Sequence, residues 1–90
     1  MNVPEVVVYT GAACPYCERA KMLLERKGVS YQEIRIDRDP EGLAAMLERS
    51  GGRRSVPQIF IGDHHVGGFD DMSALNLEGK LDPLLAGESL

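Results

Sequence analysis

The stretch "VVVYTGAACPYCERA", residues 6–20, joins an apolar run to two cysteines three positions apart. Val6 to Tyr9 is continuously apolar and mostly β-branched, which is typical of a strand covered on both faces, and a loop follows it. Pro15 suits the first position of a helix, where its missing N–H costs nothing, so Cys14 is expected near the N-cap. The pattern predicts a strand, a loop and a helix that runs to about Gly28.

The rest of the chain alternates between strand and helix signals. Tyr31 to Ile36 alternates apolar and polar residues, as an edge strand does, and Asp39-Pro40 opens a helix that ends at the breaker Ser50-Gly51-Gly52. We then expect a buried strand at residues 56–61, a hairpin turn at 62–63 and a short strand at 65–67. A third helix is expected at about 70–77, and a short last helix from 82. A βαβ unit makes its strands parallel and a hairpin makes them antiparallel. We therefore expect an α/β fold, with a mixed four-stranded sheet and helices on both faces.

Length and composition narrow the class of protein. The chain has 90 residues, 43% of them hydrophobic and 27% charged, which favours one globular domain over residues 1–90. The net charge of −4, with Arg53-Arg54 as the only basic cluster, argues against nucleic acid as a partner. The first residues carry no basic leader and only a short apolar run, so we expect neither a secretory signal nor a membrane span, and a cytoplasmic location.

The two cysteines have the spacing of a redox pair. A thiol reacts as its thiolate, and the N–H groups and dipole at a helix N-terminus stabilise negative charge. Cys14 is therefore the expected nucleophile, left accessible by Pro15 and Tyr16. Cys17, one turn later and on the inward face, is placed to attack a mixed disulfide formed at Cys14 rather than an outside substrate.

Three other interpretations of the cysteines remain open at this point. A zinc site needs about four ligands, and beyond the two thiols the chain offers only the adjacent His64 and His65, whose side chains diverge on a strand. A permanent structural disulfide would close a very small loop, which stabilises little. Inert buried thiols conflict with a cysteine that precedes a helix-initiating proline.

Three segments together resemble the dithiol glutaredoxins, particularly the small bacterial type. They are "CPYC" at residues 14–17 after the "VVVYT" strand, "SVPQIFI" at 55–61 and "VGGFDD" at 66–71. The resemblance covers nearly the whole chain. It implies a thioredoxin-like fold with strand order 2-1-3-4, and glutathione-dependent reduction of protein disulfides and of protein–glutathione mixed disulfides through Cys14 and Cys17.

The resemblance also implies a glutathione-binding site. Pro57 resembles the family's cis-proline, which presents the backbone of Val56 to an extended peptide lying beside Cys14. In "VGGFDD" the N–H groups near a helix start can hold a carboxylate, and Asp71 or Asp70 can accept from the ligand's ammonium. The implied glutathione-binding residues are Tyr16, Val56, Pro57, Gly68, Phe69, Asp70 and Asp71.

One position departs from the family pattern. Relatives commonly carry a lysine where this chain has Gly11, and that cation helps to bind the glycine carboxylate of glutathione. Candidate replacements are Arg49, Arg53 and Arg54, although solvated loop charges are an equally good interpretation of these residues. His64 and His65 are expected to be exposed turn residues without a chemical role.

The resemblance leaves two alternative functions open. A dimer could hold a [2Fe–2S] cluster through two Cys14 thiolates and two glutathiones, although Pro15 disfavours this, or the chain could be a redoxin reduced by thioredoxin reductase. The main hypothesis is a monomer with no permanently bound cofactor and no metal. Its partners are glutathione, as co-substrate, and disulfide-containing or glutathionylated proteins.

Overall fold

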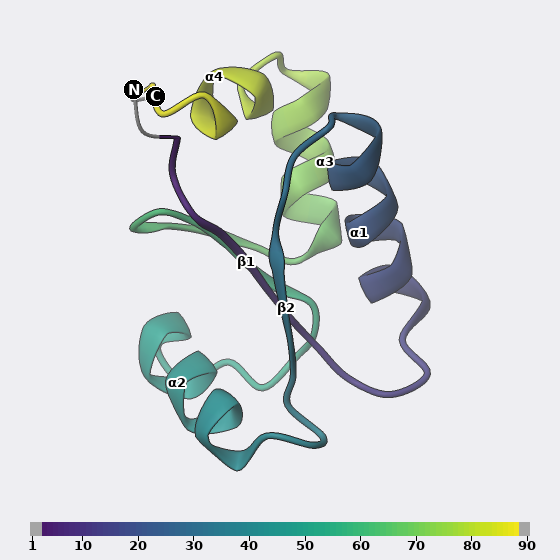
Figure 1. Ribbon diagram of the computed structural model, residues 1–90, viewed down its shortest axis with the longest axis vertical. Helices are drawn as coiled ribbons and strands as arrows, with labels where there is room; N and C mark the ends of the chain where they lie inside the picture. The colour runs from purple at the N-terminus through teal and green to yellow at the C-terminus, as the bar shows by residue number, and fades with distance from the viewer. Residues whose placement is uncertain (1–2, 89–90) are drawn as a thin grey trace.

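Two adjacent strands form the centre of a four-stranded sheet in the computed structural model, which describes residues 3–88 (Figure 1). The strands are β1 (Val6–Thr10), β2 (Gln32–Arg35), β3 (Gln58–Ile61) and β4 (His64–Gly67), and their order is β2-β1-β3-β4. β1 is parallel to β2 and antiparallel to β3, and β3 is antiparallel to β4. The predicted mixed sheet and its order 2-1-3-4 are therefore confirmed.

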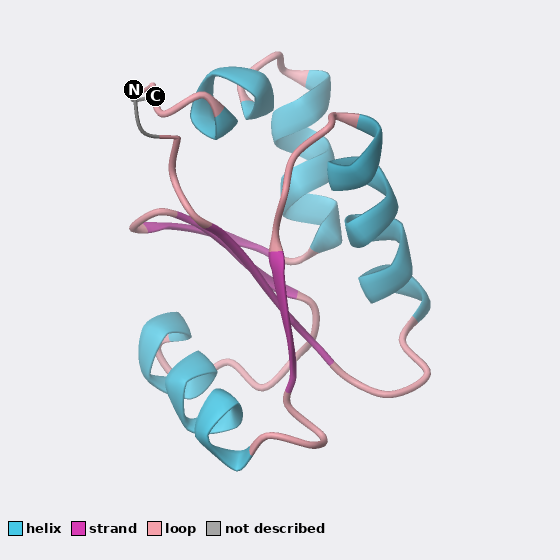
Figure 2. Cartoon of the chain, in the orientation of Figure 1, coloured by secondary structure: helices cyan, strands magenta, loops and turns pink. Residues whose placement is uncertain are grey.

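Helices cover both faces of this sheet (Figure 2). They are α1 (Pro15–Arg26), α2 (Pro40–Ser50), α3 (Phe69–Leu77) and α4 (Leu81–Leu85). Figure 1 shows α1, α3 and α4 together on one side of the sheet and α2 alone on the other. This arrangement is a thioredoxin-like fold, as the sequence predicted.

The alternation of side chains along β1 produces two separate cores. Successive residues of a strand point to opposite faces, so Val6 and Val8 pack with Leu24 beneath α1, while Val7 and Tyr9 pack with Met46 beneath α2. All of β1 is buried. This double burial explains why the first strand is a continuous apolar run rather than an alternating one.

The ends of the helices follow from local sequence, with small shifts from prediction. The side chain of Asp39 caps α2 by accepting from the N–H of Gly42 at 3.0 Å, as predicted. α3 begins at Phe69, next to the predicted Asp70, because Gly68 takes the N-cap position and its N–H donates to Asp71. Thr10, expected in the loop, belongs to β1.

None of the helices in residues 3–88 combines the length and the apolar character that a membrane span needs.

Truncating a buried leucine of α1 should destabilise the protein far more than truncating an exposed neighbour. Leu24 is 0% exposed and Met22 is 50% exposed. We expect Leu24→Ala to lower the free energy of unfolding by about 2–5 kcal/mol, and Met22→Ala, the control on the same helix, to change it by less than about 0.5 kcal/mol. Urea unfolding followed by circular dichroism measures both, and equal losses would contradict the described packing.

Candidate functional site

The two cysteines lie where β1 delivers the chain to α1. Cys14 is the N-cap residue of α1 and is bonded to Cys17 in a disulfide, with their Cα atoms 5.2 Å apart. The backbone N–H of Cys17 points at the Cys14 Sγ, 3.1 Å away. Cys14 is partly exposed, whereas Cys17 is only 1% exposed, so the predicted inward position of Cys17 is confirmed.

This geometry favours a thiolate at Cys14 once the disulfide is reduced. An N-cap side chain faces the unpaired N–H groups of the first helical turn and the positive end of the helix dipole, and both stabilise an anion. The exposed sulfur can react with substrates from outside, and the buried one can react only with Cys14.

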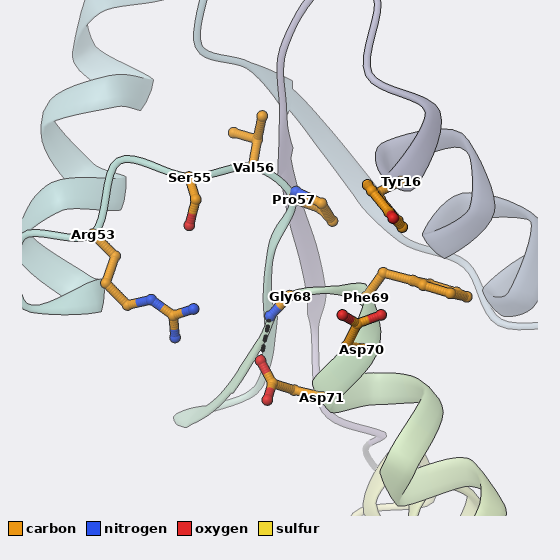
Figure 3. A pocket seen from close by; sticks show the side chains of 9 residues that line it. All are labelled: Tyr16, Arg53, Ser55, Val56, Pro57, Gly68, Phe69, Asp70 and Asp71. Atoms are coloured by element: carbon orange, nitrogen blue, oxygen red, sulfur yellow. Dashed lines mark hydrogen bonds between the residues drawn. The ribbon is translucent and has the colours of Figure 1, made fainter.

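A pocket of about 270 Å³ is lined in part by Val56 (Figure 3), whose carbonyl oxygen lies 3.8 Å from the Cys14 Sγ. Its walls come from three segments that are distant in sequence: the start of α1, the loop before β3 and the start of α3. The lining residues are Tyr16, Arg53, Ser55, Val56, Pro57, Gly68, Phe69, Asp70 and Asp71. The fold therefore brings together all seven residues that the resemblance implied for glutathione.

The loop before β3 connects the pocket to the cysteines. The peptide bond between Val56 and Pro57 is cis, as the resemblance implied, and the carbonyl oxygen of Val56 lies 3.8 Å from the Cys14 Sγ. Among residues 3–88, the N–H and C=O of Val56 have no backbone hydrogen-bond partner. They are therefore free to pair with an extended ligand beside the sulfur.

The start of α3 contributes both donors and carboxylates. The first N–H groups of a helix have no intrahelical partner, and here Phe69 and Asp70 occupy that first turn. Asp71 already holds one of its own chain's donors, because its Oδ2 accepts from the N–H of Gly68 at 2.9 Å. Figure 3 shows this bond at the edge of the pocket.

Of the three candidate arginines, only Arg53 lines the pocket. Arg49 is directed elsewhere: its guanidinium donates to the Tyr9 hydroxyl at 3.2 Å and lies 4.1 Å from the centre of the Phe60 ring. Arg49 is therefore no longer a candidate for binding the glycine carboxylate, because its guanidinium is held on the α2 face of the sheet. Arg54 is exposed and does not line the pocket.

Both histidines belong to β4 rather than to the turn, and the predicted exposure is right for His64 and wrong for His65. His64 is exposed. His65 stacks on the Phe60 ring, with centroids 4.6 Å apart, and its Nε2 lies 2.7 Å from the Oε1 of the buried Gln58. Burial, aided by the nearby Arg53, lowers the pKa of His65 from its ordinary value. The signal that was missed is the hairpin register, which pairs His65 with the buried Phe60.

Within the described part of the chain, no three His, Cys, Asp or Glu side chains lie together in a way that could hold a metal ion. Sequence reasoning also missed Ser55, which lines the pocket, and Gln58, which is 0% exposed behind it. A serine beside a glycine- and arginine-rich loop carries no signal of its own. Gln58 stands out only as a polar residue in an apolar strand.

Comparison with known proteins places the chain among close relatives. Residues 6–66 match the glutaredoxin family model. The chain is 60% identical over 84 residues to a glutaredoxin of Pseudomonas aeruginosa, covering 93% of this chain and 99% of the relative. It is 55% identical over 80 residues to glutaredoxin 3 of Escherichia coli K12, covering 89% and 95%.

Solved structures agree with the fold. The solution structure of a glutaredoxin from Brucella melitensis superposes with a TM-score of 0.83 at 53% identity, covering 100% of this chain and 98% of that one. The crystal structure of a buckwheat glutaredoxin–glutathione complex superposes with a TM-score of 0.82 at 38% identity, covering 93% and 78%.

A side chain at Gly67 should disrupt the junction that carries the pocket. Gly67 has a φ of +109°, and a Cβ there would collide with the carboxylate of Asp71. Gly79 has a φ of +74° with open space around it, so Gly79→Ala is a control that costs only backbone strain of about 1–2 kcal/mol. We expect Gly67→Ala to lower the urea midpoint more than Gly79→Ala does. Equal midpoints would show that the Asp71 contact is not restrictive.

Proposed function

This chain belongs to the glutaredoxin family and is a dithiol thiol-disulfide oxidoreductase, and from that premise we propose that it uses glutathione to reduce protein disulfides and protein–glutathione mixed disulfides. One observation carries the proposal: the Cys14 sulfur lies 3.8 Å from the carbonyl oxygen of Val56, a residue that lines the pocket. A glutathionyl group lying in that pocket presents its sulfur to Cys14.

The reaction with a glutathionylated protein needs only one protein sulfur. The Cys14 thiolate attacks the glutathionyl sulfur, the protein thiolate leaves, and a disulfide joins glutathione to Cys14. The thiolate of a second glutathione attacks the glutathionyl sulfur, releases Cys14 as its thiolate and forms glutathione disulfide. Partial exposure of Cys14 supports this route.

A protein disulfide needs both cysteines. Cys14 attacks one substrate sulfur and forms a mixed disulfide, which Cys17 then attacks at the Cys14 sulfur, releasing the reduced substrate. The product is the Cys14–Cys17 disulfide that the structure contains. Two glutathiones restore the dithiol. Burial of Cys17 supports its role as the second, internal nucleophile.

Each end of glutathione has matching chemistry in the pocket. The backbone of Val56 can pair with the cysteinyl residue as a neighbouring strand would, and the α3 N-terminus with its carboxylates can take the charged γ-glutamyl end. Arg53 can meet the glycine carboxylate in place of a cation at Gly11. A buckwheat relative has been solved in complex with glutathione, which supports glutathione as the ligand of this pocket.

The wider setting follows from the same proposal. Glutathione is a co-substrate rather than a resident cofactor, and the other partners are disulfide-containing or glutathionylated proteins. We propose that the chain acts as a monomer with one domain over residues 1–90, in the cytoplasm, where glutathione maintains thiols in reduced form.

Replacing the two cysteines separately tests the division of roles. We expect Cys14→Ser to abolish turnover of a glutathionylated peptide, because no nucleophile reaches the pocket, and Cys17→Ser to retain it. Turnover is measured by coupling glutathione disulfide formation to glutathione reductase, with thioredoxin reductase as the alternative electron source. Activity that persists in Cys14→Ser, or that depends on thioredoxin reductase alone, contradicts the proposal.

The adjacent arginines provide a matched pair for the carboxylate contact. Arg53→Ala should raise the KM for a glutathionylated peptide about two- to five-fold, the effect expected of an exposed ion pair of up to about 1 kcal/mol. Arg54→Ala removes the same charge outside the pocket and should leave KM unchanged. The difference should shrink as salt is raised, because exposed charges are screened. Equal effects of the two substitutions would remove Arg53 from the site.

A further inference from the structure

A buried glutamine links the hairpin histidine to the wall of the pocket. Gln58 is 0% exposed on β3, a strand that is otherwise apolar. Its amide nitrogen lies 2.9 Å from the carbonyl oxygen of Ser55 and 3.0 Å from the Ser55 hydroxyl, and its Oε1 lies 2.7 Å from the Nε2 of His65. A buried amide of this kind is retained only when its polar atoms are paired.

The carbonyl oxygen of Ser55 determines which group donates in each hydrogen bond between His65, Gln58 and Ser55. The carbonyl oxygen of Ser55 can only accept, so the amide nitrogen of Gln58 must face Ser55 and its oxygen must face His65. An amide oxygen also only accepts, so the Nε2 of His65 must carry a hydrogen. His65 therefore donates to Gln58, and Gln58 donates to Ser55.

The packing of His65 against Phe60 holds one end of this hydrogen-bond series in place. The imidazole lies parallel to the Phe60 ring, with an interplanar angle of 12°. Phe60 is buried and is also in contact with the Arg49 guanidinium. Ser55, at the other end, is exposed and belongs to a stretch without helix or strand.

We propose that His65 and Gln58 are positioning residues for glutathione: the His65–Gln58–Ser55 hydrogen-bond chain holds the Ser55–Val56–Pro57 segment at the distance from Cys14 that the glutathionyl group requires. The inference rests on the proposed function. Val56 contacts the Cys14 sulfur and all three residues of the segment line the pocket. Neither His65 nor Gln58 lines the pocket, and their side chains reach its wall through the hydrogen bonds to Ser55.

Two substitutions each remove a different hydrogen bond from the series that joins His65, Gln58 and Ser55. His65→Phe keeps a ring on Phe60 and removes the donor to Gln58. Gln58→Glu keeps the acceptor for His65 and removes the donor to the Ser55 carbonyl, which repels the new carboxylate oxygen; that oxygen can still accept from the Ser55 hydroxyl. His64→Phe is the matched control, because it changes the same residue type on the exposed, neighbouring position of β4.

The readout is the steady-state reduction of a glutathionylated peptide, together with the rate at which iodoacetamide alkylates reduced Cys14. We expect both His65→Phe and Gln58→Glu to raise KM about three- to ten-fold, the value of one hydrogen bond, with kcat and the alkylation rate within about two-fold of wild type. Thermal unfolding is recorded so that all kinetics are measured well below each midpoint. His64→Phe should match wild type.

The outcomes separate this inference from the proposed function. Wild-type turnover together with an unchanged KM in both variants overturns the positioning role and leaves the function standing. A fall in kcat or in alkylation rate at unchanged KM also overturns it, because the effect would then lie on the sulfur. A wild-type protein that does not turn over the glutathionylated peptide overturns both. If His65→Phe does not fold, the KM of Gln58→Glu decides.

Discussion

The N–H of Cys17 points at the sulfur of Cys14, and the site is built around that contact. At a helix N-terminus several N–H groups that lack an intrahelical partner face the same region. The proline that follows Cys14 allows the helix to begin there without losing a hydrogen bond. Once the disulfide is reduced, this contact favours a negative charge on the partly exposed Cys14 sulfur. The helical periodicity that follows buries Cys17 one turn later.

The sheet supplies the second constraint. β1 is covered on both faces, so it can carry the cysteine loop only at its end. β3 lies antiparallel beside β1, so the loop that enters β3 meets the loop that leaves β1. That neighbourhood brings Val56 against Cys14. The hairpin to β4 then returns the chain to the end of the sheet where β3 begins, and there Gly67 and Gly68 lead into α3.

Polar groups behind the pocket explain how an irregular loop holds its shape. The stretch from Arg53 to Pro57 lacks regular secondary structure, yet it forms one wall of the site. It is tied at one end to Ser50, whose hydroxyl accepts from the N–H of Arg53 at 3.0 Å, and at the other to Gln58. Because a buried amide must pair all its polar atoms, Gln58 transmits the position of a β4 histidine to a loop residue.

Local chemistry in the sequence determined much of this protein. The features that act through neighbouring residues are the β-branched run of β1, the proline after Cys14, the Asp39 cap and the "SVP" and "VGGFDD" segments. Pattern and family resemblance therefore sufficed to predict the strand order and seven residues that line the pocket. Only the tertiary structure decided which arginine faces the pocket, because Arg49, Arg53 and Arg54 carry the same charge and differ only in where their backbone aims them. It also decided that His65 is packed rather than exposed, because a one-residue difference in hairpin register moves a side chain from solvent to the covered face of a sheet. Such choices depend on contacts between distant segments, which no local pattern records.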